Sequence, residues 1–188
     1  RDMDLGDDRI RNLQIAGLLH DVGKVSIPNS ILNKPGTLSS GEYQTVKTHA
    51  EAGANIIDGV KNADVIASVV RHHHERWDGK GYPDALEAEE VPLLSRVLAV
   101  ADAFDAMASM RPYRSPMCRE DIIEEFEREA GRQFDPSLVS AFLDLCPCAP
   151  GFCFPLFFCS TCSCLFHVLL YSLCLSCENH QIPLLTSP

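Results

Sequence analysis

The feature that most constrains this chain is a run of three histidines that leads directly into a loop rich in glycine and proline. The stretch spans residues 71–83 and reads RHHHERWDGKGYP. Neutral imidazole is the commonest metal ligand among side chains, and glycine lets the backbone approach a ligand closely. A solvated helix end followed by a turn is the simpler interpretation. Several imidazoles gathered at the end of one element favour a metal site instead.

Composition divides the chain of 188 residues into two unequal parts. Only Cys118 of the nine cysteines lies before Cys146, and every lysine and arginine also lies before Cys146. The net charge of -10 therefore belongs almost wholly to the first part, which argues against a nucleic-acid polymer as partner. One cysteine in this part fits a reducing compartment, and no signal-peptide pattern precedes Leu13, so we expect a cytoplasmic protein.

Apolar residues recur at helical spacing along the first part, and no strand pattern or repeat interrupts them. The predicted helices span residues 13–20, 39–58, 63–71, 91–110, 120–130 and 136–145. The fold class is therefore all-α.

The segments between these helices carry their own signals. Residues 1–12 are typical of the frayed end of an earlier helix or linker, and residues 25–38 are typical of a loop. Gly23 is a plausible helix stop. Ser39 or Ser40 is expected to cap one helix and Asp135 another.

Six residues with metal-binding side chains lie within or at the ends of these helices. They are His20, Asp21, His49, His73, His74 and Asp102. Imidazole nitrogens mixed with carboxylate oxygens suit a divalent metal, and a carboxylate such as Asp21 can bridge two ions. Two ions a few ångströms apart activate a shared water and hold the attacking and leaving oxygens of a phosphate ester.

Several neighbours of these residues carry further expectations. Asp102 interrupts an apolar run and is a candidate buried carboxylate, which needs a partner or a metal. Gly53 lies one turn after His49, where it leaves room for something bulky beside the imidazole. Lys24, Arg111 and Arg114 offer positive charge to a phosphate.

Each of these assignments has a plainer alternative. His49 alone would more often be a satisfied core histidine than a ligand. Arg111 and Arg114 could simply cap the end of a helix, which cations favour. Trp77 and Tyr82 could pack the loop rather than stack on a base.

Together these motifs resemble, in order, those of the HD-GYP domain. The matching motifs are HDVGK at 20–24, His49 with Gly53, HHE at 73–75, DGKGYP at 78–83, AD at 101–102 and RPYR at 111–114. The resemblance runs from about Leu13 to Leu145. It implies a helical bundle of the HD superfamily with two or three divalent metal ions, iron or manganese. It also implies a phosphodiesterase that hydrolyses cyclic di-GMP to pGpG or GMP.

The resemblance also assigns roles. The metal ligands would be His20, Asp21, His49, His73, His74 and Asp102, with Asp21 bridging. Asp21 and Lys24 would serve catalysis. Substrate would be bound by Arg111, Arg114 and the loop residues Gly79, Gly81, Tyr82 and Pro83, whereas His72 falls outside the usual pair. Cyclic di-GMP, an upstream receiver or sensor domain and a second copy of the chain are the expected partners.

Two departures from the family pattern qualify this expectation. Residues 1–12 contain neither the histidine nor the glutamate that the family carries upstream of the His-Asp pair, so residues 1–145 are interpreted as an HD-GYP domain that lacks its first helix. A catalytically impaired module that binds cyclic di-GMP or a protein is therefore the alternative function. Another HD phosphohydrolase, acting on a nucleotide monophosphate, is disfavoured by the Gly-Tyr-Pro loop.

The second departure is the tail of residues 146–188, which is rich in cysteine and apolar residues. Translation in a wrong frame, a membrane tail and a cysteine metal site are the alternatives for it. We expect this tail to be non-native or disordered.

Overall fold

The computed structural model describes residues 6–110 and 115–145, and within these ranges the chain is helical. The elements are α1 (Asp7–Leu19), η1 (Val22–Ser26), α2 (Asn29–Leu32), α3 (Ser40–Asp58), α4 (Asp64–His72), η2 (Ala88–Glu90), α5 (Leu93–Ala108), α6 (Arg119–Glu129) and α7 (Pro136–Leu145), where η marks a 3₁₀ helix. The described residues contain two isolated β-bridges and no strand, which confirms the all-α prediction.

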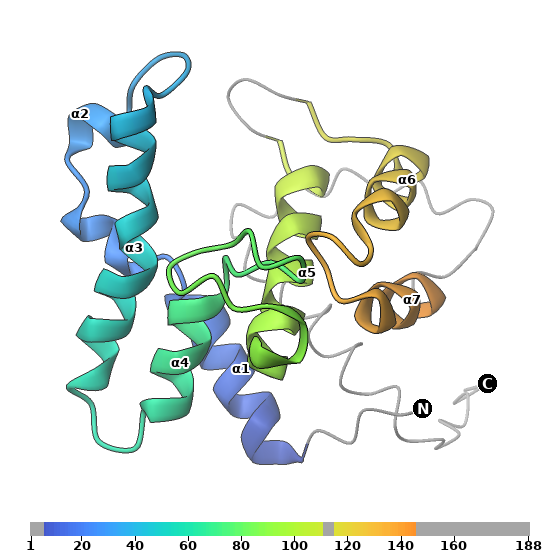
Figure 1. Ribbon diagram of the computed structural model, residues 1–188, viewed down its shortest axis with the longest axis horizontal. Helices are drawn as coiled ribbons and strands as arrows, with labels where there is room; N and C mark the ends of the chain where they lie inside the picture. The colour runs from blue at the N-terminus through green and yellow to red at the C-terminus, as the bar shows by residue number, and fades with distance from the viewer. Residues whose placement is uncertain (1–5, 111–114, 146–188) are drawn as a thin grey trace, which may run out of the picture.

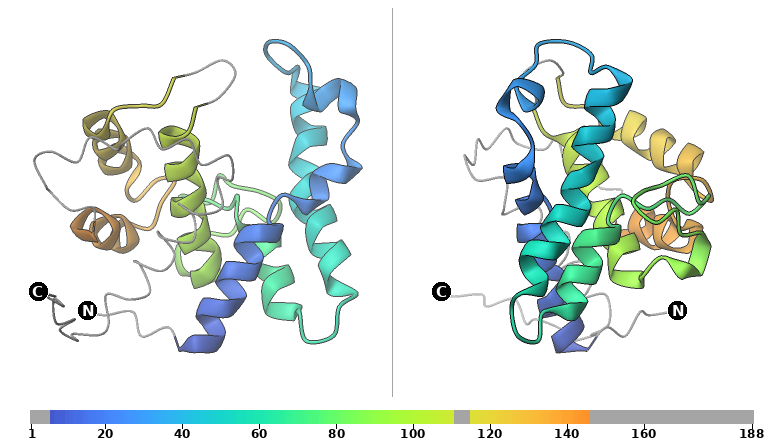
Figure 2. Two further views of the ribbon diagram at one scale, coloured as in Figure 1. Left: turned by 180° about the vertical axis from the view of Figure 1, so that it is seen from behind. Right: turned by 60° about the vertical axis from the view of Figure 1, so that its left-hand side comes forward.

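The helices form two groups that meet at α5 (Figure 1). On one side α3 and α4 pack as an antiparallel hairpin, and η1 lies against α3. On the other side α6 and α7 pack together. Figure 2 shows from behind that α1 lies between the α3–α4 hairpin and α5. The end of α4, which carries the histidine run, therefore lies at the junction of the two groups.

One hydrophobic core runs through both groups. It extends from Leu13 on α1 and Val70 on α4 through Leu98 on α5 to Phe126 on α6 and Phe142 on α7, and all five side chains are fully or almost fully buried. Burial of large apolar side chains is the main favourable term in folding, so this shared core holds the two groups together.

The predicted caps are confirmed by hydrogen bonds. The backbone N–H of Glu42 donates to Ser39 Oγ over 3.3 Å, and the N–H of Ser39 donates to the Glu42 carboxylate over 2.7 Å, which forms a capping box at the start of α3. At α7 the Asp135 carboxylate accepts from the backbone N–H of Ser137 over 2.8 Å.

Two predictions about the first forty residues were wrong. The helix predicted from residue 13 begins at Asp7. Asp7 and Asp8 place negative charge in its first turn, which stabilises the helix through its dipole. The segment predicted as a loop over residues 25–38 contains the short helix α2. Proline at position 28 precedes that helix, so it does not interrupt the helical hydrogen bonds.

Gly23 differs from its predicted role as a helix stop, whereas Gly53 leaves room beside α3 as predicted. Helix α1 ends at Leu19, and Gly23 lies within η1 with its backbone against α3. A Cβ atom on Gly23 would lie 1.9 Å from the carbonyl oxygen of His49 and 2.5 Å from the Gly53 nitrogen. The room that Gly53 leaves beside α3 is filled by the backbone of η1 and by Val70.

Three further predictions lie outside the described residues: the RPYR motif with Arg111 and Arg114, the tail of residues 146–188, and its alternatives. Across residues 6–110 and 115–145, no helix combines the length and the apolar character that crossing a membrane requires.

Candidate metal centre

The middle of one helix and the ends of two others bring four histidines together. His20 follows the last turn of α1, His49 lies in the middle of α3, and His73 and His74 follow α4. The ligand nitrogens of His49, His73 and His74 all lie within 4.8 Å of one another. His20 joins them from α1, since its ring centroid lies 5.3 Å from that of His73.

The hydrogen bonds of these histidines orient their rings. Nδ1 of His20, of His49 and of His73 lies 2.7, 2.7 and 2.6 Å from the carbonyl oxygen three residues earlier. Because a carbonyl oxygen only accepts, Nδ1 is the donor in each ring, and in a neutral ring of this tautomer the lone pair is on Nε2. This arrangement, with Nδ1 bound to backbone and Nε2 available, is typical of metal-ligating histidine.

Burial leaves two of these nitrogens without a hydrogen-bond partner among the described residues. Nε2 of His49 and Nε2 of His73 are buried, and neither has a hydrogen-bond partner within residues 6–110 and 115–145. A buried polar atom without a partner is costly, and a cation would remove that cost. The donor set therefore fits a divalent metal ion.

The charge state of the cluster also suits a metal. Burial lowers the pKa of His73 to about 4 and that of His74 to about 2, in each case with help from the neighbouring histidines. Both rings are therefore neutral near pH 7, which is the form that binds metals.

Asp21 lies between two of the histidines. Its Oδ1 is 3.6 Å from Nε2 of His49, and its Oδ2 is 3.6 Å from Nε2 of His20 and 2.6 Å from Nζ of Lys24. Burial acts to raise the pKa of Asp21, but the hydrogen bond from Lys24 and the nearby His20 and His49 outweigh it, so the pKa is lowered. An ionised carboxylate between two imidazoles is well placed to bridge two ions.

Asp102 completes the set from α5, with Oδ1 3.7 Å from Nε2 of His20. Its side chain is 34% exposed, so the expectation of a buried carboxylate was wrong. The apolar run of α5 faces the core, whereas Asp102 lies at the edge of the site. The structure thus brings together all six residues that the sequence offered as ligands, and their role as ligands stays a prediction.

The comparison with known proteins agrees with this geometry. Residues 1–138 match the HD domain family. The chain belongs to the HD domain family. The match covers all six candidate ligands of the centre.

Named relatives narrow the family. The chain is 40% identical over 147 residues to a cyclic di-GMP phosphodiesterase of Thermotoga maritima, which covers 77% of this chain and 40% of that protein. It is 41% identical over 141 residues to the cyclic di-GMP phosphodiesterase response regulator RpfG of Xanthomonas campestris, covering 74% of this chain and 37% of that protein. These relatives confirm the predicted HD-GYP domain.

Two Vibrio cholerae proteins extend the comparison. The chain is 42% identical over 139 residues to 3'3'-cGAMP-specific phosphodiesterase 2, covering 73% of this chain and 26% of that protein. A solved structure of the cyclic GMP-AMP phosphodiesterase V-cGAP3 aligns with a TM-score of 0.52 at 20% identity, over 73% of this chain and 38% of that chain. The shared fold confirms the predicted helical bundle, and the HD domain match over residues 1–138 confirms its superfamily. The chain spans between 26% and 40% of the length of these three sequence relatives.

The Gly-Tyr-Pro loop of this HD domain lies directly on the centre. The Tyr82 ring centroid is 4.9 Å from that of His74 and 6.5 Å from that of His49. Gly81 is required by close packing, because a Cβ there would lie 2.4 Å from the Cα of Glu75. Gly79 has a φ of +69°, a conformation that favours glycine. Gly79 and Gly81 therefore shape the loop, together with Pro83, and Tyr82 is the loop residue beside the histidines.

A cavity of about 380 Å³ adjoins the centre on the side of α5. Its lining includes His73, His74 and Asp102, together with Gln133 and Phe134 from the α6–α7 connection. His73 and His74 thus border a space that lies between the two groups of helices.

Lys47 was missed by the reasoning from sequence. It lies two residues before His49 on α3, and its Nζ is 5.1 Å from the Tyr82 ring centroid and 4.9 Å from that of Tyr43. The four-residue spacing of Tyr43 and Lys47 was the one available signal, since it places both on one helix face.

Proposed function

We propose that this chain is a metal-dependent phosphodiesterase that hydrolyses cyclic di-GMP to pGpG or GMP. The observation that carries the proposal is the pair of buried Nε2 atoms of His49 and His73, which have no hydrogen-bond partner in the described part of the chain, with His74 and the Asp21 carboxylate beside them. The printed activity of the relatives at about 40% identity supports the substrate.

The six clustered residues would hold two or three divalent ions, iron or manganese, with Asp21 shared between ions: His20, Asp21, His49, His73, His74 and Asp102. When bound, such ions supply a Lewis acid for a phosphoryl oxygen and lower the pKa of water.

The remaining work falls to residues of the chain. Lys24 holds its ammonium group 2.6 Å from Asp21 at the edge of the centre, where it would meet the phosphate or steady the leaving oxygen. Burial raises the pKa of Tyr82, so its hydroxyl stays protonated and can donate to the substrate while the ring covers His74. Arg111 and Arg114 would hold ligand phosphates as part of the same proposal.

A second cyclic dinucleotide is a candidate substrate besides cyclic di-GMP. The relative named as specific for 3'3'-cGAMP is 42% identical to this chain, which is no lower than the cyclic di-GMP relatives. We therefore propose 3'3'-cGAMP as the alternative substrate. The name of RpfG as a response regulator supports, in the same way, an upstream receiver domain as partner.

Metal content and hydrolysis measured on one anaerobically purified sample test the proposal. Wild-type protein is expected to hold at least two ions and to hydrolyse cyclic di-GMP, with 3'3'-cGAMP assayed in parallel. Asp21→Ala is expected to lose metal and turnover together, because it removes the carboxylate that lies between His20 and His49.

The matched control is Asp58→Ala, which removes an exposed carboxylate at the far end of α3. It is expected to keep both metal and turnover. Full activity in Asp21→Ala would overturn the proposal, and folded wild-type protein that binds the dinucleotide without cleaving it would favour a binding module.

A further inference from the structure

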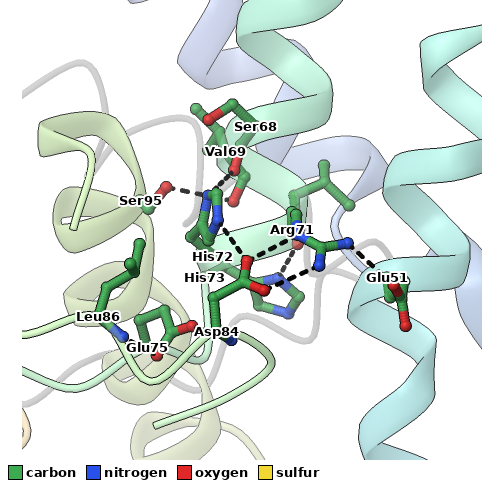
Figure 3. Close-up of polar contacts among 11 residues, drawn as sticks. Glu51, Ser68, Val69, Arg71, His72, His73, Glu75, Asp84, Leu86 and Ser95 are labelled. Carbon is green, nitrogen blue, oxygen red and sulfur yellow. Dashed lines mark hydrogen bonds and ion pairs between the residues drawn. The ribbon is translucent and has the colours of Figure 1, made fainter. Parts of the chain in front are cut away.

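Asp84 follows the Tyr82-Pro83 pair, and the end of α4 binds its carboxylate (Figure 3). Nε and Nη2 of Arg71 donate to the two oxygens of Asp84 over 2.7 and 2.9 Å. Nε2 of His72 lies 3.0 Å from Oδ2 of the same carboxylate. A two-pronged contact between guanidinium and carboxylate fixes direction as well as distance.

The backbone at Asp84 is held from the opposite side. Its N–H donates to Oε1 of Glu75 over 2.7 Å, and the N–H of Leu86 donates to Oε2 of Glu75 over 3.2 Å. Glu75 is buried, with 4% of its surface exposed, so these two bonds satisfy a carboxylate that water does not reach freely. Figure 3 shows Asp84 between Arg71 and Glu75.

These contacts connect the pieces from which the metal centre is built. Arg71 precedes His73 and His74 at the end of α4, and its third contact is Glu51 on α3, at 3.2 Å, two residues after His49. Tyr82 lies two residues before Asp84, and its N–H donates to the carbonyl oxygen of His74 over 3.3 Å.

We propose that Asp84 is a positioning residue of the site. Because Arg71 and His72 bind its carboxylate, Asp84 fixes the loop so that Tyr82 stays beside His74. The side of the centre that receives the substrate is thereby preformed. This inference rests on the proposed function. The competing interpretation is an ordinary surface ion pair. Since Asp84 is 36% exposed and Arg71 29% exposed, such a pair would contribute little to stability and nothing to substrate binding.

The test compares Asp84→Asn with Glu51→Gln. Asp84→Asn keeps the size of the side chain but loses the charge that both Arg71 and His72 bind. Glu51→Gln removes the other carboxylate from the same guanidinium without touching the loop. Steady-state hydrolysis of cyclic di-GMP, metal content, and hydrogen exchange at the amides of Asp84 and Leu86 are measured for both variants.

In Asp84→Asn we expect KM to rise about 10-fold, the lower end of the effect of removing a group that orients a site, with metal content kept and kcat changed much less. Exchange at the two amides should be faster. In Glu51→Gln, KM and exchange should stay within about twofold of wild type, since the loop anchor is intact. Arg71→Lys keeps the charge but loses the fork, so it should resemble Asp84→Asn and serves as a second variant.

Unchanged KM and exchange in Asp84→Asn, or equal changes in Glu51→Gln, would overturn the inference. Wild-type protein that hydrolyses no cyclic dinucleotide would overturn the proposed function instead. In that case the affinity for cyclic di-GMP, measured by calorimetry, takes the place of KM: a loss confined to Asp84→Asn and Arg71→Lys supports the positioning role, and equal affinities refute it.

Discussion

Substitution of Gly23 by alanine tests the packing that assembles the centre. Gly23 lies in η1, between Asp21 and Lys24 along the chain. Its backbone packs against the backbone of α3. An added Cβ would lie 1.9 Å from the His49 carbonyl oxygen and 2.9 Å from its carbonyl carbon. Both are backbone atoms of a helix, so no side chain can move aside to relieve the contact.

The expected effect follows from the displacement that the methyl group demands. An ordinary carbon contact needs roughly 3.5 Å, so η1 must move away from α3 by roughly 1.5 Å. Overpacking a tight site costs about 1–3 kcal/mol, and a clash between two backbones belongs at about 3 kcal/mol or above. The same movement separates Asp21 from His49. Since Oδ1 of Asp21 is 3.6 Å from Nε2 of His49, metal binding should weaken as well.

Urea unfolding and metal content measured on the same preparation check both effects. The control is Gly41→Ala in the first turn of α3, where a Cβ meets nothing within 4 Å. That substitution should raise the free energy of unfolding by up to about 1 kcal/mol, because alanine favours helix more than glycine does. Gly23→Ala protein with the stability and metal content of wild type would refute the packing argument.

Two further predictions concern buried charge. Burial lowers the pKa of His73 and His74 in the folded chain below the unfolded value of about 6.5. Below that pH the unfolded chain therefore binds more protons than the folded chain. The free energy of unfolding is at its full value above about pH 6.5 and decreases as the pH falls. Metal-free protein should lose about 2 kcal/mol through His73 alone between pH 7 and pH 5, measured by urea unfolding, and a flat profile would contradict the assignment. Asp135→Ala should cost about 3 kcal/mol, because it removes the cap of α7 and leaves Arg96, whose side chain is 16% exposed, without its carboxylate partner at 2.7 Å. Asp144→Ala on the exposed face of α7 should cost little. Equal thermal stability of these two variants would contradict that interpretation.

Much of this protein was determined by short-range sequence patterns. Apolar periodicity placed most of the helices, since a helix must turn one face to the core whatever it packs against. Ser39 with Glu42 placed the start of α3, because a cap acts within four residues. The order of the motifs identified the HD-GYP domain before any contact was known.

Local patterns did not predict the role of a residue where that role depends on contacts with backbone far away in the sequence. Gly23 resembles a helix stop from its neighbours, but its real constraint is the carbonyl of His49, which is 26 residues later in the chain. The sequence predicted room beside Gly53, but only the fold shows that the backbone of η1 fills it. Asp102 looked buried because its neighbours are apolar, whereas its own position on α5 faces the edge of the site.

The sequence alone therefore determined which side chains this protein can offer to a metal and a phosphate, because residue type and helical spacing are local properties. Only the tertiary structure decided that Nε2 of His49 and Nε2 of His73 are buried with no hydrogen-bond partner among the residues it describes, and that Asp84 ties the Tyr82 loop to the end of α4. Both depend on how α3, α4 and the loop pack in three dimensions, and that packing is set by contacts between residues far apart in the chain.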